Sequence, residues 1–163
     1  MKFPALLACA LIASAGAPPP EAPRPGTARA PASAALQSTA DITVTVVNMR
    51  NSQGVVRACL TDTQKSFPKC RGVPGAHVSI VDAHEGKLVL SFKAVRPGRY
   101  AIAVLHDENG NGKADRALGM MPREGFGFSR DAPVRMGPPK FDDAVFDVKG
   151  RGHAMTIKMR YML

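Results

Sequence analysis

The sequence predicts an all-β protein, an immunoglobulin-like antiparallel β-sandwich of about seven strands with one long loop. Three observations favour the sandwich. Apolar and polar residues alternate along several short segments, as in half-buried strands. Glycine (15) and proline (14) supply many turns between these segments. No long segment has helical periodicity, so packed antiparallel sheets are the natural way to bury the apolar faces.

Each predicted strand is a short apolar segment next to a turn. Residues 42–46 alternate as Ile-Thr-Val-Thr-Val, and residues 55–60 follow a Ser-Gln-Gly turn. Pro97-Gly98 forms the turn into another strand, where Tyr100 either ties the corner with its hydroxyl or only packs its ring. The seven predicted strands, in chain order, are 42–46, 55–60, 77–81, 87–92, 99–105, 144–148 and 154–161.

The N-terminus predicts export. Lys2 precedes a run of apolar or small residues, and Ala13-Ser14-Ala15 favours cleavage after Ala15, so residues 1–15 are a predicted signal peptide. A lipobox-like Leu-Leu-Ala-Cys ends at Cys9, but too few residues precede it for an ordinary apolar region. The predicted location is therefore periplasmic or extracellular, with lipid anchoring at Cys9 as the alternative.

Residues 16–40 differ in composition from the rest of the chain. They are rich in Pro, Ala, Ser and Thr and contain almost no large apolar side chains, so they predict a disordered linker. The predicted β-sandwich domain is then 41–163. No apolar run reaches the roughly 18–20 residues of a membrane-spanning helix, so no transmembrane segment is expected.

Two cysteines, Cys59 and Cys70, remain after the predicted signal peptide. An even pair in an exported domain favours a disulfide, whereas free buried thiols are the alternative. Closing so short a loop contributes roughly 3 kcal/mol in the chain-entropy model. Their spacing is not that of a redox-active C-x-x-C pair.

Residues 107–115 carry the most informative motif, D-x-N-x-N-G-x-x-D. Oxygens at alternate positions of a tight loop converge on one centre, and glycine at the sixth position permits the sharp turn. Lys113 offers its carbonyl. The predicted ligands of a Ca²⁺-type cation are Asp107, Asn109, Asn111, Lys113 and Asp115.

The motif departs from an EF-hand, because Leu118 stands where the bidentate glutamate belongs and a strand precedes the loop. Further ligands must then come from elsewhere, and affinity would be modest, about 10⁻⁴–10⁻³ M. The alternative is a hydrogen-bonded turn with no ion, because Asn, Asp and Gly are common turn formers. The candidate additional ligands are Glu124, Asp131, Asp142 and Asp143.

A connection of some twenty residues, 118–140, follows the loop. Such a length inside a compact domain indicates a functional or an ordered loop. Its aromatic residues are either anchors beneath the loop or an exposed patch, and its basic residues either meet nearby carboxylates or bind an anionic surface. The candidate ligand-contacting residues are Arg123, Phe126, Phe128 and Arg130.

Several motifs together resemble one known family. They are V-x-P-G-x-Y-A-I-A-V-x-H-D-x-N-G-N-G-K-x-D, then P-x-E-G-x-G-F-S, then G-P-P-x-F-D-D-A-x-F. The chain is similar over about 41–161 to exported bacterial proteins that share a domain of unknown function, number 2141. The resemblance implies an immunoglobulin-like or transthyretin-like sandwich and export. It implies no activity and no catalytic residues.

The function predicted from these features is a non-enzymatic binding or structural module with a Ca²⁺-type loop. A net charge of +9 favours, as an alternative, an anionic envelope surface (lipopolysaccharide or phospholipid) bound through basic residues of 116–140; an envelope protein is another possible partner. Export argues against nucleic acid. A metal-assisted hydrolase is the remaining class, but His106 stands alone, without an H-E-x-x-H pair.

Overall fold

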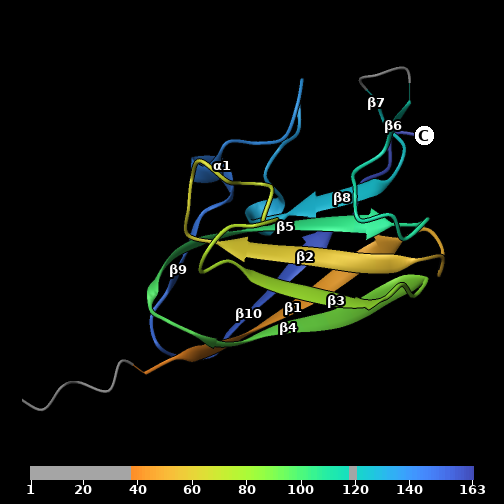
Figure 1. Ribbon diagram of the computed structural model, residues 1–163. Helices are drawn as coiled ribbons and strands as arrows, with labels where there is room; N and C mark the ends of the chain where they lie inside the picture. The colour runs from red at the N-terminus through yellow and green to blue at the C-terminus, as the bar shows by residue number, and fades with distance from the viewer. Residues whose placement is uncertain (1–37, 118–120) are drawn as a thin grey trace, which may run out of the picture. The chain divides into compact units, whose positions relative to one another are not determined.

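The computed structural model describes residues 38–117 and 121–163 (Figure 1). The predicted signal peptide lies outside these residues, and so does nearly all of the predicted linker. The first strand begins at Ala40, whose side chain is buried. The last residue assigned to the linker therefore already belongs to the folded sandwich.

The described residues form short strands, one 3₁₀ turn (η1) and one helical turn (α1). The two turns are η1 Ser129–Asp131 and α1 Phe141–Ala144. The strands are β1 Ala40–Met49, β2 Val55–Thr61, β3 His77–Asp82, β4 Gly86–Val95, β5 Gly98–Asp107, β6 Arg116–Ala117, β7 Met121–Pro122, β8 Gly125–Phe128, β9 Phe146–Val148 and β10 His153–Lys158.

Two main sheets confirm the mostly β architecture. One has the strand order β10-β1-β4, and the other has the order β3-β2-β5-β8, with β9 pairing with the start of β5. Strands β6 and β7 form a separate short hairpin. Strands β3 and β4 follow each other in the chain but belong to different sheets, so the chain crosses from one sheet to the other between them (Figure 1).

The expectation of a purely antiparallel sandwich is wrong at one pair of strands. The first strand, β1, pairs in parallel with the last, β10, with Ile42 opposite His153 and Val46 opposite Ile157. Parallel strands need a long crossover connection, and here almost the whole domain separates the two. The central strand β1 is therefore antiparallel to β4 on one side and parallel to β10 on the other.

The main core lies between the two sheets. Alternate residues of β1 point inward, as the Ile-Thr-Val-Thr-Val pattern predicts, and Ile42, Val44 and Val46 are fully buried. Strands β2, β4, β5 and β10 contribute inward-facing residues to the same core. The other fully buried large apolar residues of this core are Val56, Leu60, Val95, Ile102, Ile157 and Met159.

A second, smaller core covers the outer face of β5 and β8. Phe126 and Phe128 of β8 are buried there with Phe141 of α1. Phe67, from the loop closed by the Cys59–Cys70 disulfide, packs its ring edge-on at 5.8 Å from Phe128 and 6.0 Å from Phe141, centroid to centroid. The disulfide loop thus forms part of the layer that covers this sheet.

The sequence does not predict strand β8, because Gly-Phe-Gly-Phe does not alternate apolar with polar residues. All four of its residues are buried. A Cβ on Gly125 would lie 2.3 Å from the Tyr161 ring, and one on Gly127 would lie 2.7 Å from Ile157. The two glycines therefore let the C-terminal segment approach β8 closely, while the two phenylalanines supply the second core.

The predicted strand ends near the C-terminus need correction. Residues 144–148 were expected as one strand, but Ala144 ends α1 and the strand is only Phe146–Val148. The helical turn forms because the backbone N–H of Lys140 donates to Asp143 Oδ2 at 3.2 Å, and the Asp143 N–H donates back to the Lys140 carbonyl at 3.1 Å. The last predicted strand ends at Lys158 rather than at 161.

None of the helices in the described part of the chain has the length and apolar character needed to cross a membrane.

The second core predicts a specific loss of stability. Phe67→Ala should lower the free energy of unfolding by about 2 kcal/mol, because a half-buried ring that joins two other rings is lost. Urea unfolding of the oxidised protein measures this change. Met136→Ala, which removes a fully exposed side chain, is the control and should leave the midpoint unchanged. An equal effect of the two substitutions would contradict the assignment of Phe67 to a core.

Candidate functional site

The 107–115 loop begins where β5 ends. Asp107 is the last residue of β5, and its side chain is fully buried. Its Oδ2 atom accepts a hydrogen bond from the backbone N–H of Gly112 at 2.8 Å. Gly110 and Gly112 both have positive φ, +69° and +73°, which glycine adopts without steric cost. The buried carboxylate at the first position therefore organises the turn at the sixth.

The polar side chains of the loop face one another. The Oδ1 atom of Asn109 accepts from the N–H of Asn111 at 3.0 Å, and the Oδ1 atom of Asn111 accepts from the N–H of Lys113 at 2.7 Å. Both amide nitrogens donate to Asp115 Oδ2, at 2.7 and 2.8 Å. Each amide oxygen keeps a second lone pair. The loop thus brings together four of the predicted ligands, whereas the Lys113 side chain is exposed.

Glu124 reaches the same loop from the segment between β7 and β8. Its Oε2 atom accepts from the backbone N–H of Asp115 at 3.1 Å, and the Asp115 carbonyl accepts from the N–H of Arg123 at 3.0 Å. Glu124 is only 4% exposed. Of the four additional candidate ligands, the loop contacts this one.

Two buried oxygens at this place have no hydrogen-bond partner among the described residues: Asp107 Oδ1 and Glu124 Oε1. The N–H of Glu108 faces the Glu124 carboxylate closely enough to lower its pKa, but it makes no hydrogen bond with Oε1. A buried carboxylate oxygen without a partner is costly. Each of the two is therefore an unsatisfied acceptor on a residue that contacts the loop.

Three carboxylates and several guanidinium groups lie at this loop. Burial raises the pKa of Glu124, and repulsion from Asp107 and Asp115 raises it further. The Arg57 guanidinium lies 3.8 Å from Asp107 Oδ2, and the Arg50 guanidinium interacts with Glu124 at longer range.

Among the described residues, no three His, Cys, Asp or Glu side chains form a group that could hold a metal ion. Carboxylates alone thus do not make a site in the arrangement seen. A site at 107–115 would need the amide oxygens of Asn109 and Asn111 and the carbonyl of Lys113 as well, which is the mixed oxygen set that Ca²⁺ accepts.

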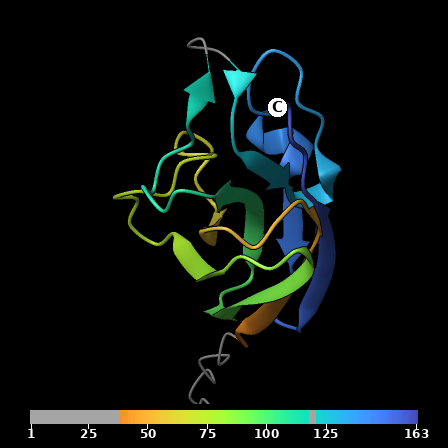
Figure 2. The same cartoon turned by 90° about the vertical axis from the view of Figure 1, so that its right-hand side faces the viewer.

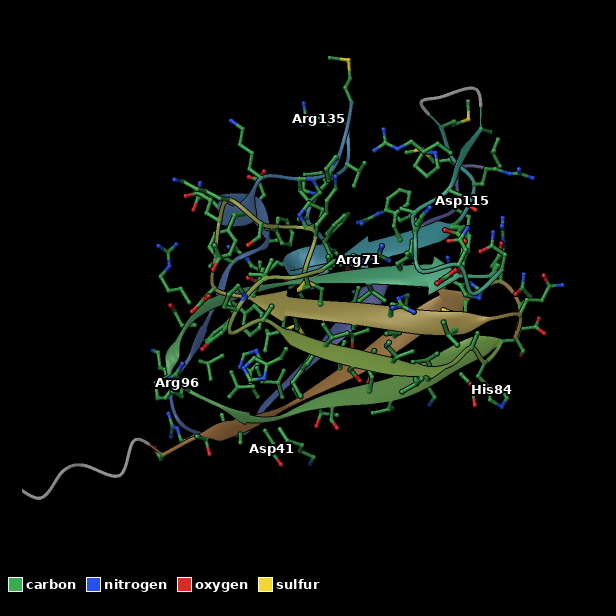
Figure 3. The ribbon with its side chains drawn as sticks, in the orientation of Figure 1. Asp41, Arg71, His84, Arg96, Asp115 and Arg135 are labelled. Atoms are coloured by element: carbon green, nitrogen blue, oxygen red, sulfur yellow. A yellow bond between two sulfur atoms is a disulfide. The ribbon has the colours of Figure 1, made fainter. Side chains whose placement is uncertain are left out.

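The disulfide loop touches the 107–115 loop. Cys59 and Cys70 are bonded, as the sequence predicts. The next residue, Arg71, donates from Nη2 to the Gly112 carbonyl at 2.7 Å (Arg71 and Asp115 are labelled in Figure 3). A Cβ on Gly112 would lie 3.0 Å from this guanidinium. The sequence carries no signal for this contact, because it depends on how two loops meet above β2 and β5.

His106 belongs to the interior rather than to an open site. Its ring is fully buried, with Nε2 at 2.8 Å from the Gln53 carbonyl and Nδ1 at 2.9 Å from Tyr161 Oη. Because a carbonyl only accepts, Nε2 carries the proton and Nδ1 accepts from the tyrosine hydroxyl. Tyr161 Oη accepts in turn from the N–H of Arg50 at 3.2 Å. Both ring nitrogens are therefore occupied.

Arg50 and Glu108 close the side of this network. The Arg50 guanidinium donates to both oxygens of Glu108 and lies 4.6 Å from the centroid of the Tyr161 ring. This arginine lowers the pKa of Glu108 mainly through its hydrogen bonds. The residue after Asp107 is thus engaged in a structural ion pair.

Of the other predicted site residues, Arg123 contacts the loop only through its backbone N–H on the Asp115 carbonyl, and Phe126, Phe128 and Arg130 lie elsewhere. Phe126 and Phe128 are buried in the second core, as the anchor interpretation expects. Arg130 has φ +58° and donates to the Val145 carbonyl at 3.2 Å. The carbonyl of the exposed Arg123 accepts from Arg50 Nη2 at 3.0 Å.

Three further acids also lie away from the loop. Asp131 accepts from the Lys158 N–H at 3.2 Å, and Asp142 and Asp143 belong to α1, near the start of β5 rather than its end (Figure 1). They cannot complete a site at 107–115. One sequence feature distinguishes Glu124 from the other three candidates. It follows Asp115 by nine residues, and a hairpin between the two can bring them together.

The His106–Tyr161 hydrogen bond predicts a measurable stability. Tyr161→Phe should lower the free energy of unfolding by about 1–2 kcal/mol, because Nδ1 of the buried His106 loses its donor while the ring is retained. Chemical denaturation measures it. Tyr100→Phe is the matched control, because Tyr100 is buried in the main core and its hydroxyl makes no hydrogen bond to another described residue. Equal losses would contradict this role for the Tyr161 hydroxyl.

Comparison with known proteins gives one match. No curated protein and no solved structure matches the chain. A family model described as "Uncharacterized protein conserved in bacteria (DUF2141)" matches residues 44–156, from the middle of β1 to the middle of β10. This range includes both main sheets, the disulfide, the 107–115 loop and Glu124. The chain therefore belongs to the DUF2141 family of bacterial proteins.

Proposed function

We propose that this protein is an exported, non-enzymatic binding or structural module whose 107–115 loop holds a Ca²⁺-type cation. One observation carries the proposal: Asp107, at the first position of the loop, is fully buried, and its Oδ1 atom has no partner among the described residues. A cation at this position would satisfy the oxygen that the protein leaves unpaired.

The donor set suits a hard cation. The loop offers carboxylate oxygens from Asp107 and Asp115, amide oxygens from Asn109 and Asn111, and the Lys113 carbonyl. Ca²⁺ takes six to eight such oxygens and tolerates flexible geometry, so water can fill the remaining positions. Asn109 and Asn111 are exposed, which leaves a route for the ion from solvent.

Export and the finer fold class are part of the proposal. The Cys59–Cys70 disulfide supports an oxidising compartment such as the periplasm or the extracellular space. The two-sheet arrangement supports an immunoglobulin-like or transthyretin-like relationship. In such folds a rigid sandwich carries binding loops at its ends, as β5 carries this one.

The non-enzymatic assignment is supported by the state of His106. A metal-assisted hydrolase would need a histidine that can reach metal or substrate, but both nitrogens of this ring are engaged inside the protein. Of the remaining histidines, His153 stacks on Phe146 with a centroid separation of 5.1 Å. These contacts favour structural roles for both.

A calcium titration tests the proposal. The protein with its disulfide intact should show saturable binding heat and a rise in Tm at millimolar Ca²⁺. Asp107→Asn should abolish both, because it removes a ligand charge while its amide oxygen can still accept the Gly112 N–H. Absence of heat and of any Tm shift in the unmutated protein would refute the cation site.

A second candidate function is association with an anionic phospholipid surface. Met136 is fully exposed, next to Arg135, in a connection stiffened by Pro133, Pro138 and Pro139. Both views show this connection projecting on the same side of the domain as the β6–β7 hairpin (Figure 1 and Figure 2). Arg135 lies on the projecting part (Figure 3). An exposed apolar tip beside cations suits an anionic interface.

Vesicle binding tests this second candidate. The protein should sediment with phosphatidylglycerol vesicles, should not sediment with phosphatidylcholine vesicles, and should be released by salt. Met136→Asp should weaken binding at least about fivefold, since the inserted side chain contributes roughly 1 kcal/mol or more. Val89→Asp, at an equally apolar exposed site on β4, is the control. Equal weakening by both, or no preference for the anionic lipid, would exclude a membrane role for this tip.

A further inference from the structure

We infer that Glu124 is a direct ligand of the cation held by the 107–115 loop, so that binding joins the segment between β7 and β8 to that loop. The inference rests on the proposed function. Glu124 would supply the carboxylate that the loop motif lacks, from a part of the chain outside the motif.

The position of Glu124 carries the first step. Its Oε2 atom holds the backbone N–H of Asp115, so the carboxylate is fixed against the last residue of the motif. Its Oε1 atom is buried and has no partner among the described residues. A solvent-exposed carboxylate oxygen could hydrogen-bond to water, but Glu124 is only 4% exposed. The free oxygen is thus available to a ligand beside the loop.

The second step is the pairing of two such oxygens. Asp107 Oδ1 is the other buried acceptor without a partner, and it comes from the opposite end of the motif. The Gly112 N–H donates to Asp107 Oδ2, and the Asp115 N–H donates to Glu124 Oε2, so both carboxylates are fixed against the loop. A buried carboxylate with one unpaired oxygen therefore lies at each end of the motif.

Few ion pairs reach these carboxylates. Arg57 offers Asp107 one contact at 3.8 Å, and no ion pair among the described residues includes Asp115 or Glu124. Arg50, which interacts with Glu124 at longer range, is paired with Glu108. Packing carboxylates together without counter-charge is unfavourable, and a divalent ion reverses that cost. Glu124 would raise the loop's side-chain and carbonyl ligands from five to six, the lower end of the Ca²⁺ range.

Water is the main alternative occupant. A buried water could donate hydrogen bonds to Asp107 Oδ1 and Glu124 Oε1 and would satisfy both without an ion. The two cases differ in ion dependence. If water occupies the site, the protein should not respond to Ca²⁺. If a cation occupies it, calcium affinity should depend on the charge of Glu124 more than on its hydrogen bonds.

The decisive variant is Glu124→Gln, because glutamine keeps an oxygen that can accept the Asp115 N–H but removes the charge. Without calcium it should melt higher than the unmutated protein, by roughly 3 °C, since a buried repulsive carboxylate is gone. With calcium it should lose the Tm rise and bind at least about tenfold more weakly. Asp142→Asn, the same loss of charge at an exposed position of α1, is the matched control and should change neither quantity.

Calorimetry and thermal melting with CaCl₂, and in parallel with MgCl₂, decide the outcome. Calcium binding by Glu124→Gln equal to that of the unmutated protein would overturn the inference and leave the proposed function standing. No calcium response in the unmutated protein would overturn both. If Glu124→Gln does not fold, Glu124→Asp replaces it: the shorter side chain keeps the charge, and unchanged calcium affinity in that variant would also overturn the inference.

Discussion

Strand β5 is buried on both faces, and most of the architecture follows from that burial. Ile102 and Val104 point into the core between the sheets, while Ala101 packs into the second core on the outer face. A sheet with two apolar faces needs a layer on each side. One layer is the sheet of β1, β4 and β10. The other is assembled from irregular segments, and this explains why a β-domain of this size carries a disulfide loop, a helical turn and a long ordered connection.

The outer layer is built from short segments that are far apart in the chain. Phe67, Phe128 and Phe141 come from three separate segments and meet over β5 and β8. The disulfide anchors the first of these segments to β2. Gly125 and Gly127 permit the C-terminal segment to lie against the other side of β8. Aromatic packing, the disulfide and the two glycines thus allow irregular segments to cover this face of the sheet. No third sheet is needed to bury it.

The candidate cation loop follows from the same scaffold. Because β5 is held by strands and by both cores, its last residue, Asp107, is placed in the interior with little freedom. The loop then turns back to the surface at Gly110 and Gly112. Two neighbouring segments contact it, the disulfide loop through Arg71 and the β7–β8 segment through Glu124. A change in the loop would therefore reach both the disulfide loop and the β7–β8 segment, although neither adjoins it in the sequence.

Features that depend on neighbouring residues can be predicted from the sequence. Alternation in residues such as 42–46 predicts the strands, the two cysteines predict their bond, and the Asp-Asn-Gly spacing predicts a tight oxygen-rich loop. The parallel pairing of β1 with β10 and the burial of the Gly-Phe-Gly-Phe strand are seen only in the three-dimensional arrangement. The same is true of the distant acid that contacts the loop, which is Glu124 and not Asp131. Strand pairing, burial of both faces and proximity of charges depend on segments far apart in the chain, and such contacts leave no local period or spacing in the sequence.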